Sequence, residues 1–397
     1  MANVSSSNGL EKRPKLRFPG FDEPYKQCHI GDIYAERSQR GASDMELLSV
    51  TMNDGVKPRS EIEGKDNSSE DKSNYKIVRK GDMVYNSMRM WQGANGISPC
   101  DGIVSPAYTV LMPKQEINNG YFAALFKSAN LINEFRKNSQ GMTSDTWNLK
   151  YPQIETIKVQ IPSVSEQDKV SEMFSVLDER IATQSQLIES LKKYKRGLLH
   201  DVLSEKIRFT KEEWTTHKIG EFLQSKSIKQ LPTADAPLMA FTATGGVCDK
   251  GERYDRGFLV KDASSKLYKR TDLNDFIYSS NNLDVGSIGL NLYGSAVISD
   301  VYEIFSIKDA DPWFISEAIK QKAIMSCILK YRQGCLYGQY RIYVEDFLSV
   351  AIKVPSYEVQ KKVGAAFSKI NGKITQEQIM LDCLEKARTF FLQQLFI

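Results

Sequence analysis

An apolar seam with heptad spacing runs through residues 165–203 and limits what this chain can fold into. Its positions, separated by alternating steps of four and three residues, are Val170, Phe174, Leu177, Ile181, Gln184, Ile188, Leu191, Lys195, Leu198 and Val202. This spacing is typical of a helix that pairs with another helix. At 1.5 Å per residue the helix would be roughly 58 Å long. A helix with one narrow apolar stripe is not stable alone in water, so the sequence predicts a partner helix.

A second seam with the same pattern lies 193 residues further along the chain. Its positions are Val363, Phe367, Ile370, Ile374, Glu377, Leu381, Leu384, Arg388, Phe391 and Leu395. Outside the two seams, the same offset relates Pro162 to Pro355 and Gln167 to Gln360. An offset shared by helical and non-helical segments indicates an internal duplication rather than two unrelated amphipathic helices.

The duplication predicts two copies of a globular domain followed by a long helix. The predicted boundaries are 1–162 for the first domain, with residues 1–14 a disordered tail, 163–205 for the first helix, 206–355 for the second domain and 356–397 for the second helix. Short apolar segments between Gly and Pro turns indicate mostly β domains with one or two short helices each, including one at 121–136 and one at 312–330. The predicted fold class is α+β, with two similar domains separated by two long antiparallel helices that form a coiled coil with pseudo-two-fold symmetry.

The polar positions within the seams suggest a register for the two helices. The helices are expected to be antiparallel, because the first enters the second domain directly and the second must run back from it. Pairing Lys195 with Glu377 would place Gln184 opposite Arg388, and both polar layers would then be complementary. The apolar residues expected at the helix contact include Phe174, Leu177, Ile181, Phe367, Ile370 and Ile374.

Composition excludes several classes of protein. Hydrophobic residues make up 41% and charged residues 26% of the chain, and no apolar run is long enough to span a membrane. The polar N-terminus lacks the apolar segment of a signal peptide, so we expect a cytoplasmic protein. Six cysteines without CxxC spacing and only three histidines make a metal site improbable. A net charge of +4 permits a nucleic-acid partner without requiring one.

Two similar domains held at a fixed separation suit double-stranded DNA, whose half-sites repeat with the helical turn. The domains differ in their loops, so each is expected to read a different half-site. Arg can read guanine, and Asn or Gln can read adenine, in the major groove. Ordinary polar loop residues would look the same in the sequence, and phosphate contacts outnumber base contacts. The candidate DNA-binding residues are Arg89, Trp91, Gln92, Gln140, Thr143, Ser144 and Asn148 in the first domain, and Asn281, Asn282, Asn291, Arg332, Gln333, Gln339 and Arg341 in the second.

The chain resembles the specificity (S) subunit of type I restriction-modification enzymes over nearly its whole length. The residues that carry the resemblance are the segments 15–21 (KLRFPGF), 80–85 (KGDMVY), 157–162, 166–167 and 191–199 (LKKYKRGLL), with the repeated Ile-Gly-Asp/Glu at 30–32 and 219–221. The resemblance implies two DNA-recognition domains and two methylation (M) subunits that use S-adenosylmethionine to methylate an adenine in each half-site. It also implies a motor-nuclease (R) subunit that uses ATP and magnesium.

The chain itself is expected to be non-catalytic and to hold no cofactor. It has no Asn-Pro-Pro-Tyr/Phe methyltransferase motif, no Gly-rich loop for the methionine cofactor and no phosphate-binding loop. Two alternatives remain open: a coiled-coil scaffold whose domains bind proteins, and the recognition subunit of a smaller system whose partner fuses cleavage and methylation.

Overall fold

Two long helices, α5 (Val164–Leu203) and α9 (Tyr357–Gln394), dominate the computed structural model. The structure describes residues 2–3, 13–41, 44–52, 55–207, 211–243, 245–249, 266–281, 283, 287–336 and 339–397. The chain divides into a first unit, Met1–Gln186 with Ile379–Ile397, and a second unit, Leu187–Gln378. Each long helix therefore contributes residues to both units.

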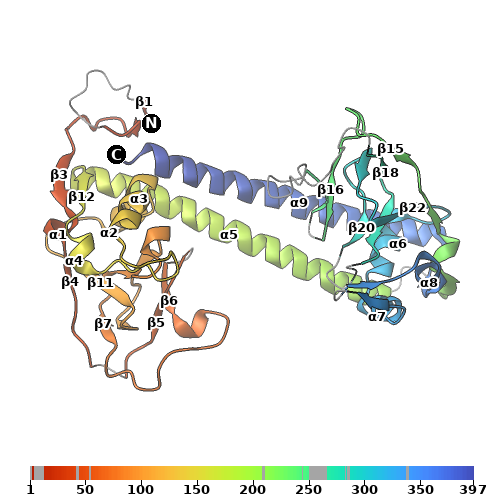
Figure 1. Cartoon of the computed structure of the whole chain (residues 1–397), viewed down its shortest axis with the longest axis horizontal. Coiled ribbons are helices and arrows are strands. Elements are labelled where there is room, and N and C mark those ends of the chain that lie inside the picture. The colour runs from red at the N-terminus through yellow and green to blue at the C-terminus, as the bar shows by residue number, and fades with distance from the viewer. Residues whose placement is uncertain are drawn as a thin grey trace. The chain divides into compact units, whose positions relative to one another are not determined.

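The first unit is built on the four-stranded sheet β4-β11-β8-β9, in which β11 pairs with β4 and β8 (Figure 1). Its other elements before α5 are short. Its elements are β1 (Ala2–Asn3), β2 (Leu16–Arg17), β3 (Lys26–His29), α1 (Ile30–Ile33), β4 (Tyr34–Glu36), β5 (Leu48–Thr51), β6 (Gly55–Pro58), η1 (Arg59–Glu61), β7 (Lys76–Val78), β8 (Met83–Asn86), η2 (Met90–Gln92), β9 (Asn95–Ile97), β10 (Gly102–Val104), β11 (Tyr108–Pro113), α2 (Asn119–Leu125), α3 (Ala129–Asn138), α4 (Tyr151–Ile154) and β12 (Lys158–Ile161). Most of the predicted disordered tail lies outside the described residues, and β1 pairs with β2.

The second unit repeats this plan around the sheet β14-β22-β19-β20. Its elements are β13 (Thr215–Lys218), η3 (Ile219–Glu221), β14 (Leu223–Ser225), β15 (Lys229–Gln230), β16 (Ala240–Thr242), β17 (Gly246–Cys248), β18 (Tyr268–Thr271), β19 (Phe276–Ser279), β20 (Ile288–Leu290), β21 (Ala296–Ile298), β22 (Tyr302–Ile307), α6 (Pro312–Ile319), α7 (Lys322–Leu329), β23 (Gln333–Leu336), β24 (Gln339–Arg341), α8 (Val344–Ser349) and β25 (Ala351–Val354). The fold class is α+β with an internal repeat, as predicted.

Each of the segments 121–136 and 312–330, predicted as one short helix, contains two helices in the structure. In the first unit Phe126 ends α2, and the Ser128 hydroxyl accepts a hydrogen bond from the Leu131 amide at 3.4 Å and so caps α3. A serine at this position satisfies a free amide of a helix start, which favours a new helix over continuation of the old one. The second domain has the same break between α6 and α7.

A buried glutamine joins each long helix to its domain in the same way. Gln167 donates to the carbonyl of the proline before α5 at 3.0 Å, and its carbonyl accepts from the backbone of Asn118 at 3.0 Å. Gln360 makes the same two bonds in the second unit, at 2.9 Å and at 3.2 Å to the backbone of Asp311. Asn118 and Asp311 in turn cap α2 and α6. The duplication is therefore visible in individual hydrogen bonds as well as in the sheets.

The two long helices run antiparallel where they meet within a unit. In the first unit Phe174 of α5 stacks on Phe396, which follows α9, with ring centroids 5.9 Å apart. One turn further along α5, Asp178 accepts hydrogen bonds from Arg388, which lies earlier in α9. Every predicted seam position in both helices is buried or half-buried.

The predicted register of the helices is wrong by six residues. Lys195 donates to Asn371 at 2.8 Å and to Glu317 of α6 at 3.2 Å, whereas Glu377 forms an ion pair with Lys373 on its own helix. Arg388 lies beside Asp178 instead of Gln184. Both partners, Asn371 and Asp178, stand six residues before the predicted ones (377 − 371 and 184 − 178). The physical reason is that Glu317, buried on α6, supplies the carboxylate that Lys195 needs.

Candidate nucleic-acid interface

A backbone hydrogen bond, called the clasp below, joins two loops of the first unit that are distant in the sequence. Residues 87–94 follow β8 and contain η2, and residues 139–149 connect α3 to α4. The backbone amide of Leu149 donates to the carbonyl of Ser87 at 2.8 Å. Leu149 is fully buried and anchors its loop, as Met90 anchors η2. The clasp brings together the two groups of candidate residues, which the sequence places at opposite ends of the domain.

An aromatic contact joins the same two loops. The rings of Trp91 and Trp147 meet edge to face with centroids 5.2 Å apart. The indole nitrogen of Trp91 donates to the carbonyl of Met88 at 3.1 Å, so the ring also closes its own loop. The guanidinium of Arg136, on the last turn of α3, lies 5.8 Å from the centre of the Trp91 ring. Such a cation–aromatic contact is worth about 0.5–1 kcal/mol at an exposed site.

Most of the candidate residues in the first unit are accessible to a ligand. Arg89, Gln92, Gln140, Thr143 and Ser144 are exposed, and Trp91 is half-buried. The loop between Gln140 and Asn148 is held by backbone hydrogen bonds in both directions between these two residues, at 3.0 and 2.8 Å. Asn148 differs from the others, because its side-chain oxygen is buried and cannot reach a ligand without a local movement.

The second unit carries an equivalent clasp. The amide of Ile342 donates to the carbonyl of Ser280 at 3.1 Å, and both residues stand 193 positions after Leu149 and Ser87. Beneath this clasp, the buried phenol of Tyr278 donates to the carbonyl of Ile342 at 3.3 Å. Burial raises the pKa of this phenol well above its usual range, so Tyr278 is a neutral donor at any physiological pH.

The predicted polar loop of the second unit contains the hairpin β23–β24, and arginines lie close to tyrosines in this segment. The guanidinium of Arg332 lies 5.7 Å from the ring centre of Tyr340, and that of Arg341 lies 5.2 Å from that of Tyr343. Arg341 is exposed, with its nearest carboxylate, Glu303, at 3.8 Å. Basic groups beside exposed aromatic rings are suited to nucleic-acid phosphates and bases.

The prediction for Asn291 is wrong. Its side chain is fully buried, its amide group donates to Thr271 at 3.1 Å and to the carbonyl of Gly294 at 2.7 Å, and its oxygen accepts from the amide of Tyr293 at 2.9 Å. Asn291 stabilises a turn here through hydrogen bonds to backbone groups, which is a common role of asparagine.

The other candidates of the second unit differ in accessibility. Gln333 is exposed but donates to Asp346 at 2.9 Å, and Asn281 is half-buried and accepts from Ser280 at 3.3 Å. Gln339 lies in β24, and only its backbone is described. Asn282 lies outside the described residues.

Sequence reasoning missed the residues that hold these loops. Trp147 and Arg136 were not candidates, although a tryptophan within a polar loop is a signal that could have been used. The tyrosines at 331, 340 and 343 were missed in the same way; they alternate with the arginines that were chosen. An aromatic residue at every few positions of a basic loop is a known pattern of nucleic-acid binding.

Within the described ranges, no group of His, Cys, Asp and Glu side chains has an arrangement that could hold a metal ion. In the same part of the chain, no helix combines the length and the apolar character needed to cross a membrane.

Comparisons with known proteins agree with this architecture. Residues 30–193 match the family model of the type I restriction modification DNA specificity domain. The chain is 24% identical over 346 residues to the type I restriction enzyme MjaVIII specificity subunit of Methanocaldococcus jannaschii, a match that covers 79% of this chain and 77% of the relative.

Solved structures share the fold. The S subunit of a type I restriction-modification system from M. genitalium superposes with a TM-score of 0.64 at 16% identity, covering 97% of this chain and 99% of that one. A chain of another type I R-M system reaches a TM-score of 0.50 at 14% identity, covering 95% and 98%.

The duplicated domain and helix are the architecture that the chain shares with these specificity subunits. Residues 30–193 match the DNA specificity domain of type I restriction-modification systems, and the chain as a whole is similar to specificity subunits of such systems.

Proposed function

We propose that this chain reads a bipartite, asymmetric DNA target, with one domain on each half-site. The observation that carries the proposal is the pair of equivalent clasps, Leu149 to Ser87 and Ile342 to Ser280. Exposed polar and basic side chains from two loops lie beside the first clasp, and the exposed Arg341 and Tyr343 flank Ile342 at the second. The two domains share a backbone arrangement but differ in their exposed side chains, so they are suited to different base sequences.

The chain acts as the recognition part of a larger complex. Two methylation subunits dock on it and transfer a methyl group from S-adenosylmethionine to N6 of an adenine in each half-site. A motor-nuclease subunit that uses ATP and Mg²⁺ completes the restriction complex. The chain contributes no catalytic group of its own, and it works on double-stranded DNA in the cytoplasm. The match of residues 30–193 to the type I DNA specificity domain and the lack of a methyltransferase or phosphate-loop motif support this assignment.

Methylome sequencing of a host with and without this gene tests the proposal. Loss of N6-methyladenine from a two-part motif on deletion, and its return on complementation, is the expected result. An unchanged methylome in a host whose methylation subunit is intact and expressed would instead favour a scaffold whose domains bind proteins.

Exchanging one exposed arginine in each domain is expected to relax one half of the motif at a time. Arg89→Ala should broaden the bases accepted in the half-site read by the first domain, and Arg341→Ala those in the other. Loss of a bidentate base contact costs roughly 1–3 kcal/mol of discrimination. Methylomes of the two variants check this, and a change in both halves of the motif from either variant would contradict the assignment of one domain to one half-site.

A further inference from the structure

Arg136 lies near the end of helix α3, just before the loop 139–149 that carries candidate DNA-binding residues. It lies on the last turn of α3, and the loop 139–149 begins directly after this helix. Two hydrogen bonds end the helix, from the Ser139 hydroxyl to the carbonyl of Phe135 at 2.7 Å and from the Asn138 amide group to the carbonyl of Glu134 at 2.9 Å. The departure point of the loop is therefore well defined, and Arg136 lies beside it.

The guanidinium of Arg136 is held by an aromatic ring and not by a carboxylate. It lies 5.8 Å from the Trp91 ring centre, and no acidic side chain in the described part of the chain forms an ion pair with it. Trp91 in turn contacts Trp147 of the second loop. A continuous series of contacts thus runs from α3 through the first loop into the second.

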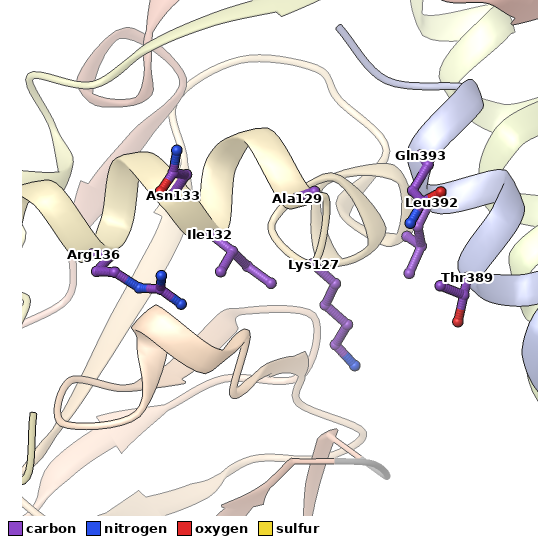
Figure 2. Close-up of a pocket in the computed structure, with 8 residues that line it drawn as sticks. All are labelled: Lys127, Ala129, Ile132, Asn133, Arg136, Thr389, Leu392 and Gln393. Carbon is purple, nitrogen blue, oxygen red and sulfur yellow. The ribbon is translucent and has the colours of Figure 1, made fainter. Parts of the chain in front are cut away.

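The first loop is also seated closely against α3. Gly93 ends η2 with a left-handed backbone (φ 86°), a conformation that favours glycine. A Cβ atom at this position would lie 3.4 Å from Lys127 and 3.5 Å from Ile132. Figure 2 shows Ile132 and Arg136 on α3, and Lys127 on the turn before it, on one wall of a groove of about 370 Å³ that Thr389, Leu392 and Gln393 close on the other side.

We propose that Arg136 is a positioning residue for target discrimination by the first domain. It acts through Trp91 and Trp147, by fixing the two reading loops relative to each other, and it does not itself read a base. The inference rests on the proposed function, because it concerns the accuracy of the same DNA-binding surface.

The test uses the full chain in complex with its methylation subunits. Binding is measured on duplexes that carry the methylated motif and on duplexes with one base changed in either half. Arg136→Ala is expected to lower discrimination in the first domain's half-site about two- to fivefold, the value of an exposed cation–aromatic contact. Discrimination in the other half and the dependence of affinity on salt should stay unchanged. Arg136→Lys, which keeps a cation above the ring, should retain most of the discrimination.

A double substitution separates positioning from a direct phosphate contact. If Arg136 acts through Trp91, then Arg136→Ala has no further effect on discrimination in a Trp91→Ala background, because both changes break the same series of contacts. The matched control is Lys137→Ala, since Lys137 is the adjacent exposed cation and pairs with Glu134 at 2.7 Å. It should leave discrimination in both half-sites unchanged.

Three results would overturn the inference. The first is additive effects of Arg136→Ala and Trp91→Ala on discrimination. The second is an equal loss of affinity for every sequence with a salt slope lower by about 1, as expected for a lost phosphate contact. The third is discrimination by Arg136→Ala equal to that of the wild-type complex. If instead the wild-type complex binds all duplexes alike, the proposed function fails, and the inference fails with it.

Discussion

Arg17→Met is expected to lower the free energy of unfolding of the first unit by about 3–5 kcal/mol. Arg17 and Glu166 form a two-pronged ion pair, with N–O distances of 2.9 and 2.8 Å, and both side chains are almost fully buried, at 5% and 1% exposure. The hydroxyl of Tyr25 also donates to Glu166, at 3.2 Å. The hydrogen bond with Glu166 raises the pKa of Arg17, so the guanidinium stays charged. Removing it leaves a carboxylate buried without its counter-charge, which is the cause of the large loss.

The second copy of the domain suggests a second substitution that should restore the lost stability. Val359, a buried apolar residue, stands at the position equivalent to Glu166. The double variant Arg17→Met with Glu166→Val should therefore regain most of the lost stability, because a buried ion pair can be replaced by apolar groups of similar volume.

Urea unfolding of the full chain, with hydrogen exchange of the amides at the start of α5, measures these effects. Lys169→Ala, which removes an exposed cation from the same helix, is the control and should change stability by less than about 0.5 kcal/mol. A single variant as stable as the control would show that the pair is not a stabilising contact, and a double variant without recovery would show that the unpaired carboxylate is not the cause of the loss.

Gly364→Ala is expected to destabilise the second unit by about 2–4 kcal/mol, the sum of overpacking and a lost helix cap. A Cβ atom at Gly364 would overlap the carboxylate oxygen of Asp311, and this oxygen accepts the hydrogen bond from the amide of Phe314 that caps α6. The added methyl group and the carboxylate cannot occupy the same space. Either α9 moves away from α6 or the cap is broken.

Gly372→Ala on the same helix is the matched control and should have the opposite sign. Open space surrounds Gly372, so an added methyl group meets nothing. Alanine in a helix interior is favoured over glycine by roughly 0.5–1 kcal/mol, so this variant should be more stable than the wild type. Thermal unfolding of both variants, with hydrogen exchange at Phe314, checks the prediction, which fails if the two variants unfold alike.

The long helices and the duplication could be predicted because their signals are regular. The apolar seam positions repeat at fixed steps in α5 and α9, and Gln167 and Gln360 recur at the same offset with the same hydrogen bonds. The register could not be predicted. It depends on Glu317, which α6 brings beside Lys195, and a partner from a third element is invisible when two helices are compared alone.

The candidate interface was predictable in part for a related reason. A polar residue in a loop, such as Arg89 or Thr143, is exposed unless it satisfies a backbone group, and Asn291 does the latter. The amino-acid type alone does not distinguish the two cases. The contact between Trp91 and Trp147 depends on the path of the whole domain, and a local pattern carries no information about it.

The two loop clasps have a consequence for how such a protein can change over generations. Each is a bond between backbone atoms, from Leu149 to Ser87 and from Ile342 to Ser280. A backbone hydrogen bond fixes the position of a loop and does not depend on the side chains that point away from it. Substitutions at the exposed loop positions should therefore cost little folding free energy. A lineage could thus acquire a new DNA preference one residue at a time and remain folded at every step.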